Sequence, residues 1–360
     1  MSDRPSEERV RVALVVDSDA FGGAEVYARQ LLRRAAHEVP GVEPVALVAA
    51  PVAAHFGERD VRVTGLHRHR EEAPELAAEL AALEPDVVHV NLVDPASNRA
   101  ALRAALEVAP TTATLHLQGD PGPDPAGLRA VLGRLAAALA PSATIAAQLR
   151  DLGVRDVHRV RNGVDLPAAP ATPRDARPLR LGAVGRLTDQ KGFDLLLDAV
   201  EKVDPDGRRM HLTIAGAGRD RDALLRRADG LPVTFTGHCA DIQGFLAGLD
   251  AFVLPSRREA LSLALLEAMG AGLPCLTTDV GDHAEAVGDD ALVVPPDDVA
   301  ALTAALDRLL DDAGLRAAPA PRARARALRD FGADRMVRQS AQVLAAVART
   351  ARTARATARG

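Results

Sequence analysis

The stretch AFVLPSRREALSLALLEAMGAGLPCLTT, residues 251–278, carries the pattern that decides the fold. A short β-branched and aromatic run, AFVLP, precedes a charged loop, a helical run rich in Ala and Leu, and a second short run, PCLTT. A strand, a helix and a strand in this order predict a βαβ unit on a parallel sheet. We expect the helix to begin at Leu261, with Glu259 at its mouth and Glu267 within its apolar run.

The same alternation runs along both halves of the chain. The first half contains VRVALVV, PDVVHV and TTATLH, and the second contains LRLGAVG, MHLTIAG, VTFTG and ALVVPP, each beside a helical run. We therefore predict an α/β protein with two Rossmann-like, doubly wound parallel-sheet domains. Ligands of such sheets bind beyond the carboxyl ends of the strands, so we expect the two domains to face a central cleft.

Prolines and helical periodicity set the predicted boundaries. The proline-rich, aperiodic segment 166–178 is interpreted as a linker between domains at 1–165 and 179–330. We expect a helix over 331–347 and a basic tail over 348–360, which is flexible or a fraying helix. The helix has one apolar face, formed by Met336, Val343, Leu344 and Val347.

Composition narrows the class of protein. The 360 residues are 48% hydrophobic and 26% charged, with a net charge of -5, which indicates a globular protein without the basic surface that nucleic acid needs. No apolar run reaches the roughly 18 to 20 residues of a membrane span, and the start MSDRPSEERV is polar. We expect a cytoplasmic protein that does not bind nucleic acid and has no integral membrane association.

Neither cysteines nor histidines indicate a metal site. Cys239 and Cys275 have no partners at metal-ligand spacing and are interpreted as buried or idle thiols. The run of alternating histidine and arginine from His67 to Arg70 is interpreted as a solvated loop in preference to a metal or anion site. We expect no metal.

Glu259 and Glu267 form the first candidate site. Glu259 follows a strand at its carboxyl end, and Glu267 lies a little over two helical turns further on, roughly on the same side of the helix. The free N–H groups at the helix start suit an anion. A carboxylate repels phosphate, so each acid is suited to sugar hydroxyls on the two sides of a diphosphate. The alternative is a helix-terminal acid and a partly buried acid paired with an arginine.

The segment GRLTDQKGF, residues 185–193, is the second candidate. Gly185 and Gly192 allow a close backbone approach, while Arg186 and Lys191 offer a planar fork and a compact charge to two adjacent phosphates. Lys191 is notable because the chain uses arginine almost everywhere else. The alternative is an ordinary solvated loop.

Two features of the first half form the third candidate. Gly22 and Gly23 precede a helix that we expect to begin near Ala24, so a ligand can pack against backbone N–H groups there. His116 ends the strand TTATLH at the carboxyl edge of its sheet. The alternative for His116 is a strand-end histidine whose ring is satisfied within the fold.

In this order and spacing the segments resemble the retaining glycosyltransferases of family 4, also called glycosyl transferases group 1, which have the GT-B fold. The matching pieces are FGGAEVYARQLL, PDVVHVN, TLH, RNGVD, GRLTDQKG, TIAGAG, VTFTG, AFVLPSRREALSLALLEAMGAGLPCL, VGDHAEAV and ALVVPPDD. The two acids with seven residues between them are the specific part. The family usually has Gly after the first acid, and Ala260 stands there, which leaves the donor sugar open.

The resemblance implies a role for each position. Glu267 would hold ribose hydroxyls and Glu259 those of the transferred sugar, Arg186 and Lys191 would clamp the diphosphate, and His116 would lie beside the anomeric carbon. The remaining donor contacts implied are Gly22, Gly23, Gly185, Gly216, Gly237, His238, Ala260, Leu261 and Ser262, the last two through backbone donors. Candidate acceptor contacts in the first domain are Asn91, Asn98 and Asn162. The 331–347 helix is expected to cross back to the first domain.

The activity that the resemblance implies is metal-independent transfer, with retention, of a hexose from a nucleoside diphosphate sugar. We favour a UDP-sugar donor and a small polyol, aminocyclitol or other natural-product acceptor, in a monomer or homodimer without a cofactor. The alternatives are a glycosyltransferase of polysaccharide or glycolipid assembly, a nucleotide-sugar epimerase, and a non-catalytic nucleotide-sugar-binding subunit. A phosphorylase is disfavoured, because it needs a lysine for its pyridoxal cofactor and the chain has only Lys191 and Lys202.

Overall fold

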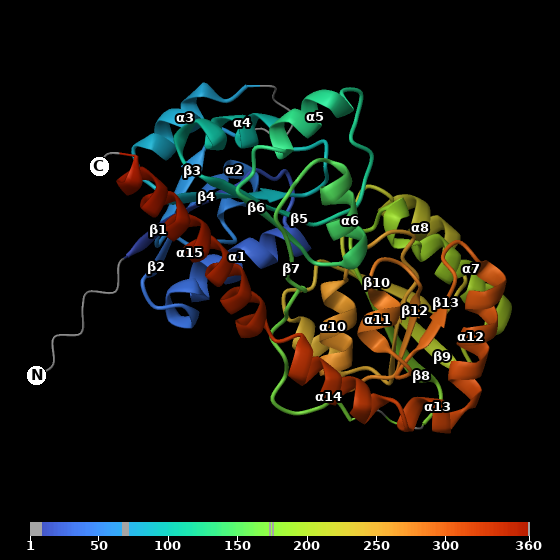
Figure 1. Ribbon diagram of the computed structural model, residues 1–360. Helices are drawn as coiled ribbons and strands as arrows, with labels where there is room; N and C mark the ends of the chain where they lie inside the picture. The colour runs from blue at the N-terminus through green and yellow to red at the C-terminus, as the bar shows by residue number, and fades with distance from the viewer. Residues whose placement is uncertain (1–8, 67–71, 173, 175, 359–360) are drawn as a thin grey trace, which may run out of the picture. The chain divides into compact units, whose positions relative to one another are not determined.

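The computed structural model describes residues 9–66, 72–172, 174 and 176–358. The run from His67 to Arg70 lies outside the described residues, as do most of the polar start, residues 173 and 175 of the proline-rich segment and residues 359–360 of the predicted tail. The chain forms two compact units, shown in Figure 1. Unit 1 comprises Met1–Gly163 together with Ala333–Gly360, and unit 2 comprises Val164–Gly332.

Unit 1 is built on a parallel sheet that has seven strands among the described residues, in the order β3-β2-β1-β4-β5-β6-β7. Its strands are β1 (Val10–Val16), β2 (Val42–Ala49), β3 (Val61–Thr64), β4 (Val87–Leu92), β5 (Thr111–Leu115), β6 (Ala137–Ala140) and β7 (Val157–Arg159). Its helices are α1 (Gly23–Glu38), α2 (Ala50–Ala53), α3 (Pro74–Ala81), α4 (Arg99–Val108), α5 (Pro125–Leu132), α6 (Ala143–Asp151) and α15 (Ala333–Thr357).

Unit 2 repeats this plan with a parallel sheet of six strands, in the order β10-β9-β8-β11-β12-β13 over the described part. Its strands are β8 (Leu179–Val184), β9 (Met210–Ala215), β10 (Val233–Gly237), β11 (Ala251–Leu254), β12 (Cys275–Thr278) and β13 (Leu292–Val294). Its helices are α7 (Phe193–Val203), α8 (Arg221–Arg227), α9 (Ile242–Ala247), α10 (Leu263–Gly270), α11 (His283–Val287), α12 (Val299–Asp311), α13 (Ala313–Ala317) and α14 (Ala320–Asp330), and a 3-10 turn covers Asp189–Lys191.

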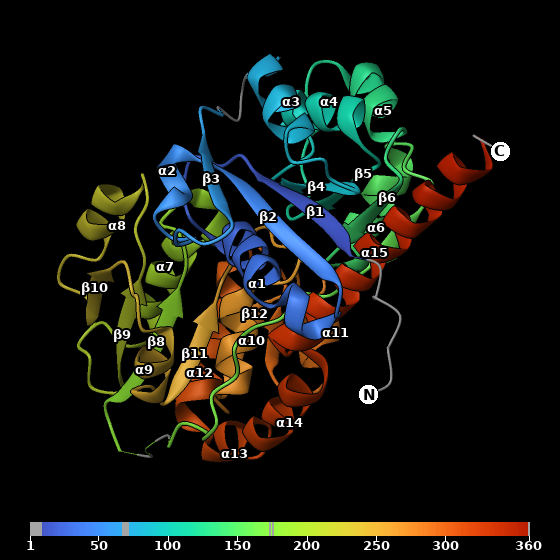
Figure 2. The same cartoon turned by 90° about the vertical axis from the view of Figure 1, so that its left-hand side faces the viewer.

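Both sheets are doubly wound, as the alternation predicts. The strand order reverses between β1 and β4 in unit 1 and between β8 and β11 in unit 2 (Figure 2). At such a reversal the loops that leave the two strands diverge to opposite faces of the sheet and open a ligand site. Gly22 and Gly23 follow β1, Arg186 and Lys191 follow β8, and Glu259 follows β11, whereas His116 follows β5, the neighbour of β4.

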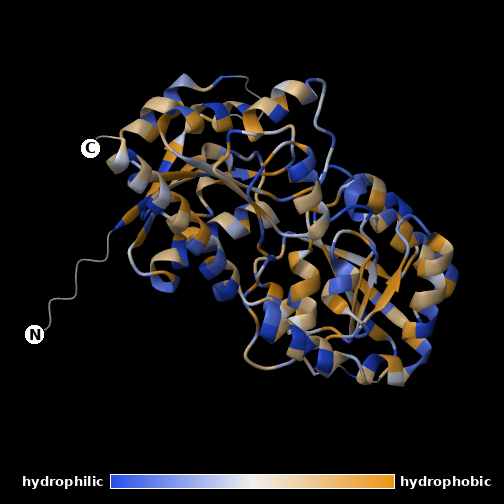
Figure 3. Cartoon of the chain, in the orientation of Figure 1, coloured by the Kyte–Doolittle hydropathy of each residue, from blue (hydrophilic) through white to orange (hydrophobic). Residues whose placement is uncertain are grey.

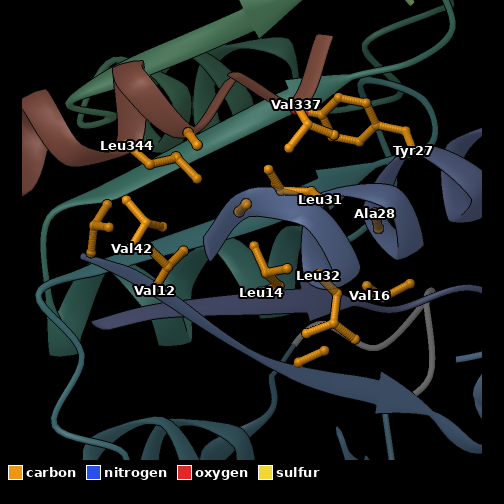
Figure 4. Close-up of a cluster of buried hydrophobic side chains, with 14 of the residues drawn as sticks. Val12, Leu14, Val16, Tyr27, Ala28, Leu31, Leu32, Val42, Val337 and Leu344 are labelled. Atoms are coloured by element: carbon orange, nitrogen blue, oxygen red, sulfur yellow. The ribbon is translucent and has the colours of Figure 1, made fainter. Parts of the chain in front are cut away.

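The cores form because the strands are apolar on both faces and the helices are apolar on one. Figure 3 shows the hydrophobic colouring concentrated along the strands and on one side of the helices around them. In unit 1 the core joins β1 and β2 to α1 and α15, as the labelled side chains in Figure 4 show. Met336 and Leu344 of α15 are buried there, and Val343 and Val347 pack partly buried against them, so the predicted apolar face is confirmed.

The C-terminal helix does cross back to unit 1, where α15 packs on α1. It also extends further than expected, because the segment after 347 continues as helix to Thr357 in place of a flexible tail. Ala348 is fully buried, and the Arg352 guanidinium binds both carboxylate oxygens of Asp86, at 2.8 and 2.6 Å. These contacts hold a segment whose composition alone indicates fraying.

The segment expected to be a linker packs on unit 2. The Arg324 guanidinium donates hydrogen bonds to the carbonyls of Pro167 and Ala168, and the Ala171 N–H donates to the Ala271 carbonyl at 2.7 Å. The first described part of this segment is therefore held by α14 and the end of α10.

Among the helices in the described part of the chain, none has the length and apolar character needed to cross a membrane.

Candidate functional site

The centre of the site in unit 2 is an ion pair between Lys191 and Glu259. Lys191 ends the 3-10 turn after β8, and Glu259 lies in the loop after β11. The Lys191 ammonium donates a hydrogen bond to Glu259 Oε1, which also accepts from the Ser256 hydroxyl at 3.1 Å. The two side chains are only 12% and 11% exposed. The predicted phosphate-binding lysine and the predicted sugar-binding acid therefore neutralise each other in the ligand-free protein.

The pair keeps Glu259 ionised. Burial acts to raise the pKa of the Glu259 carboxyl, but the positive charge of Lys191, the neighbouring His283 and the hydrogen bonds from Lys191 and Ser256 together outweigh burial and lower the pKa. A carboxylate that is ionised at neutral pH accepts hydrogen bonds and does not donate them. Glu259 can therefore bind ligand hydroxyls as an acceptor.

Arg257 ties the two loops of the ion pair together. Its guanidinium binds both oxygens of Asp194, at 2.7 and 2.6 Å, as well as Asp297 at 2.6 Å and the Asp189 carbonyl at 2.8 Å. Its backbone N–H also donates to the Gln190 carbonyl at 2.8 Å. These contacts raise the pKa of Arg257 further above its already high value, chiefly through Asp194. Arg257 fixes the distance between the loops that present Lys191 and Glu259.

Glycines allow the close packing around this pair. The Lys191 methylenes lie over Gly185, where an added Cβ would sit 3.1 Å from Lys191 Cδ. Gly216 packs against Gly185 in turn, and its Cβ would fall 1.8 Å from the Gly185 carbonyl oxygen. Gly192 has a positive φ of 64°, and its Cβ would lie 2.1 Å from the Pro255 oxygen. The fold itself thus requires glycine at 192 and 216, whereas at 185 an added Cβ would require only that the Lys191 side chain shift by a few tenths of an ångström.

Helix α10 begins at Leu263, two residues later than expected, with Ser262 as its N-cap and no side chain capping its free N–H groups. The Ser262 N–H, predicted to face a ligand, instead donates to Nε2 of the buried His283 at 3.3 Å. His283 Nδ1 lies 3.2 Å from the Thr278 carbonyl, which can only accept, so the proton is on Nδ1. His283 thus holds the end of the loop between β11 and α10, and the sequence did not indicate this role.

Glu267 differs from Glu259 in having no partner. No residue in the described parts of the chain donates a hydrogen bond to its carboxylate. Burial, and to a smaller extent the charge of Asp165, raise the pKa of Glu267 to about 7. Burial, then the charge of Asp241 and last that of Glu267 raise the pKa of the Cys239 thiol. The buried Glu267 carboxyl group is therefore available to hydrogen-bond a ligand.

The other candidates in unit 2 fall into two groups. Arg186 and His238 are exposed, and no hydrogen bond from within the described residues holds the Arg186 side chain. Ala260 and Leu261 are buried, at 2% and 3% exposure. Gly281, which the sequence did not indicate, brings the next loop against them: its Cβ would lie 2.1 Å from the Ala260 oxygen. This loop fixes the backbone at the position where the family usually has Gly.

In unit 1 the Gly22–Gly23 segment is held by Glu25. The Gly22 N–H donates to Glu25 Oε2 at 2.7 Å, and the Ser18 hydroxyl donates to Glu25 Oε1. Gly22 has extended backbone, and a Cβ there would meet only Glu25 Oε2, at an ordinary 3.5 Å. Neither conformation nor space within the ligand-free protein requires glycine at this position.

His116 lies at the carboxyl end of β5, in a compact polar cluster. Its Nε2 is 2.6 Å from Asn91 Oδ1, and the Asn91 Nδ2 group donates to the Ala24 carbonyl at 3.2 Å. The edge of the ring packs on Tyr27, with 4.9 Å between centroids and 64° between planes. Burial, and then the nearby His89, lower the pKa of His116 to about 3, so the ring is neutral at physiological pH.

The candidate acceptor residues are buried within unit 1. Asn91 and Asn98 are each 1% exposed, and the Asn98 Nδ2 group donates to the Asp17 carbonyl at 2.6 Å while its Oδ1 accepts from Ser97 at 2.7 Å. Asn162 is buried as well, at 9% exposure. The amides of Asn91 and Asn98 support the loops of unit 1, and nothing in the sequence distinguished that use from ligand contact. Within the described residues, no group of three or more His, Cys, Asp and Glu side chains is arranged to hold a metal ion.

Comparison with known proteins agrees with this arrangement. Residues 21–167 match the model described as Glycosyltransferase Family 4, and residues 178–312 match Glycosyl transferases group 1. A glycogen synthase of Mycobacterium tuberculosis is 36% identical over 211 residues, 55% of this chain and 50% of that protein. An alpha-D-kanosaminyltransferase of Streptomyces kanamyceticus is 35% identical over 164 residues, 42% of each protein. The chain spans about half the length of the curated relatives it matches.

Solved structures share the fold. HepE from Anabaena, in complex with UDP and glucose, superposes with a TM-score of 0.78 at 20% identity, over 94% of this chain and all of that one. Sucrose-phosphate synthase from Thermosynechococcus elongatus gives a TM-score of 0.74 at 19% identity, over 93% and 98% of the two chains. The two adjoining family models, the doubly wound sheets and these structural neighbours lead to one conclusion: the chain belongs to the group 1 and family 4 glycosyltransferases, which have the GT-B fold.

Proposed function

We propose that the protein transfers a hexose from a nucleoside diphosphate sugar to a hydroxyl group of a small polyol or aminocyclitol, with retention of the anomeric configuration. The observation that carries this proposal is the Lys191–Glu259 pair, nearly buried at the carboxyl edge of the unit 2 sheet. A donor that brings phosphate to Lys191 and sugar hydroxyls to Glu259 would replace the contact that each makes with the other.

Three further groups support the donor assignment. Glu267 offers a carboxylate without an internal partner, which suits the paired hydroxyls of a ribose. Arg186 is exposed beside Gly185, and the uncapped N–H groups of α10 provide a positive dipole end. These positive groups would stabilise the diphosphate without a metal ion. UDP is the favoured nucleotide because the structurally similar HepE is described with UDP and glucose.

The proposed reaction needs no protein nucleophile. The bond from the anomeric carbon to the diphosphate oxygen breaks, the acceptor oxygen forms a bond to that carbon on the same face, and the departing phosphate takes the acceptor proton. Negative charge grows on the diphosphate during this step. Lys191 and Arg186 would therefore bind the transition state more strongly than the intact donor, and their removal should lower turnover more than donor affinity.

Similarity to relatives supports two classes of acceptor. The alpha-D-kanosaminyltransferase favours an aminocyclitol-type acceptor, and a lipopolysaccharide core mannosyltransferase of Rhizobium meliloti, 33% identical over 182 residues, favours cell-surface glycan. We prefer the small acceptor because few aromatic side chains, 2% of residues, are present to stack on a long glycan.

The test is a donor screen followed by an acceptor screen. UDP-, GDP- and ADP-sugars are incubated with the full chain in excess chelator, and slow donor hydrolysis identifies the donor. Polyols, aminocyclitols and oligosaccharides are then offered with it, and NMR of the product gives the anomeric configuration. Tight nucleotide binding with neither hydrolysis nor transfer would show a binding subunit, and loss of binding in chelator would contradict the metal-free mechanism.

Lys191→Ala and Lys191→Arg sharpen this test. A charge-assisted hydrogen bond is worth roughly 1.5 to 3 kcal/mol, so Lys191→Ala should slow turnover by about 10- to 100-fold. The larger, planar guanidinium of Lys191→Arg has to pass over Gly185, where the lysine methylenes already lie close. We expect Lys191→Arg to remain slow in single-turnover assays. Recovery of the parent rate would show that any cation suffices at this position.

A further inference from the structure

The orientation of the Asn91 side-chain amide is fixed by its partners. Asn91 lies on β4, is 1% exposed, and has its Nδ2 group 3.2 Å from the Ala24 carbonyl oxygen. A carbonyl oxygen can only accept a hydrogen bond, so the amide must present its nitrogen to Ala24. Oδ1 therefore faces His116, at 2.6 Å from Nε2.

This orientation determines which nitrogen of His116 carries the proton. Amide Oδ1 can only accept, so the Nε2 at 2.6 Å must be protonated. Burial and the neighbouring His89 hold the pKa of His116 near 3, so the ring carries a single proton at neutral pH. Nδ1 is consequently an unprotonated acceptor. No residue in the described part of the chain donates a hydrogen bond to it, and the ring remains partly accessible.

The ring plane is held as firmly as the tautomer. The edge-on contact with Tyr27 fixes the ring from one side. The Tyr27 hydroxyl donates to Ser340 of α15 at 2.9 Å and accepts from Thr114 of β5 at 3.1 Å, so the phenol itself cannot turn. His116 is thus oriented by β4, β5, α1 and α15 together.

We propose that Asn91 is the positioning residue that fixes His116 as the neutral Nε2–H tautomer and leaves Nδ1 to accept a hydrogen bond from a hydroxyl group of the transferred sugar. The assignment of the ligand hydroxyl rests on the proposed function, whereas the tautomer does not. Through Ala24, the same amide also joins the ring to the first turn of α1, directly after Gly22 and Gly23. His116 in this state supplies a lone pair and no proton, so it serves as an acceptor and not as a general acid.

The tautomer is tested on the ligand-free full chain, labelled with 15N at histidine. Long-range proton–nitrogen correlation spectra distinguish a protonated from a bare ring nitrogen, and the His116→Gln variant assigns the signal. We expect a protonated Nε2 and a bare Nδ1 in the parent. In Asn91→Leu this preference should be lost, while Asn98→Leu, which removes an equally buried amide bound elsewhere, should preserve it. A parent with the proton on Nδ1, or an unchanged tautomer in Asn91→Leu, would overturn the proposal.

Asn91→Asp covers the case in which Asn91→Leu does not fold. Its carboxylate still accepts from Nε2, so the tautomer should remain, but the added negative charge should raise the pKa of His116 measurably in an NMR titration. The groups that face the ring in this titration are Tyr27 and His89. An unchanged His116 pKa would show that residue 91 does not contact the ring and would overturn the proposal.

Kinetics with the identified donor test the ligand contact. Asn91→Leu should lower kcat by about tenfold, the equivalent of one misplaced hydrogen bond, and leave the dissociation constant of the free nucleotide unchanged. Asn91→Asp should retain more activity than Asn91→Leu because it keeps the tautomer. Equal activity in Asn91→Leu and the parent would refute the positioning role. A parent that transfers no sugar would refute the proposed function and leave the tautomer result standing.

Discussion

Replacing Lys191 by methionine should destabilise the ligand-free protein substantially. Methionine keeps most of the side-chain volume but leaves the Glu259 carboxylate, 11% exposed, with Ser256 as its remaining hydrogen-bond donor. Removing one partner of a buried pair costs about 3 to 5 kcal/mol, and partial exposure places this pair at the lower end. For a unit of this size, about 3 kcal/mol lowers Tm by roughly 6 to 12 °C.

Thermal and urea unfolding of the full chain at pH 7.5 measure this effect. Lys202→Met is the matched control, because Lys202 is the other lysine and is exposed on α7, so its replacement should change stability by less than about 0.5 kcal/mol. The double variant Lys191→Met/Glu259→Gln should cost less than the two single changes together. Additive costs, or a Lys191→Met variant as stable as Lys202→Met, would refute the ion pair as a stabilising contact.

The pH dependence of the free energy of unfolding tests the same ion pair. The folded pKa of Glu259 is lower than its unfolded value, so its contribution to stability is fully present above the unfolded pKa and is lost as pH falls through the folded pKa. The stability difference between the parent and Lys191→Met should therefore be constant near neutral pH and shrink in acid. A difference that grew in acid would contradict this assignment.

Three further changes test other parts of the structure. The pKa of Glu267 is raised to about 7, so its contribution to stability is present below the unfolded pKa and is lost as pH rises through 7. Urea unfolding at several pH values should show this dependence in the parent and not in Glu267→Gln. Parallel pH profiles of the two proteins would contradict the raised pKa. Gly216→Ala places a Cβ 1.8 Å from the Gly185 oxygen and should lower the free energy of unfolding by about 2 kcal/mol or more. The control is Gly230→Ala, which replaces a positive-φ glycine in open space and should cost clearly less. Tyr27→Phe leaves the Ser340 and Thr114 hydroxyls without the phenol and should cost about 1 to 3 kcal/mol in denaturant unfolding, whereas no change would show that solvent replaces it.

The sequence predicted the type of fold because parallel strands buried on both faces leave continuous apolar runs. Strands such as β1, β4, β8 and β11 are of this kind, and their carboxyl ends located the candidate loops. Strands β2, β3, β6 and β7 were not among the predicted strands; of these, β3 (Val61–Thr64) lies at the edge of its sheet and is largely exposed. An exposed edge strand such as β3 has a weak hydrophobic pattern of its own, although the edge strands β10 and β13 were predicted from theirs.

The contacts within the site could be predicted only in part. Spacing identified Lys191 and Glu259, but the pair depends on two loops that Arg257 joins over a long sequence separation. The Ser262 N–H, just before the start of α10 at Leu263, donates to His283, a contact between residues on different elements. Asn91 was predicted to contact the acceptor from its position in the sequence. Only the structure shows that its side-chain amide is hydrogen-bonded to Ala24 and His116 within the fold. Tertiary contacts, which leave no periodic trace in the chain, account for each difference.

The return of α15 to unit 1 has a consequence for how the protein is made. A ribosome completes residues 1–163 first, yet the apolar surface of α1 stays without the Met336, Val337 and Leu344 side chains until α15 emerges. Unit 2 is continuous in sequence, from Val164 to Gly332, and can close while unit 1 still waits. Domains normally mature in the order of their synthesis, with the N-terminal one first. Here unit 1 cannot complete its core until α15 has been made, so the apolar surface of α1 stays uncovered while unit 2 is synthesised.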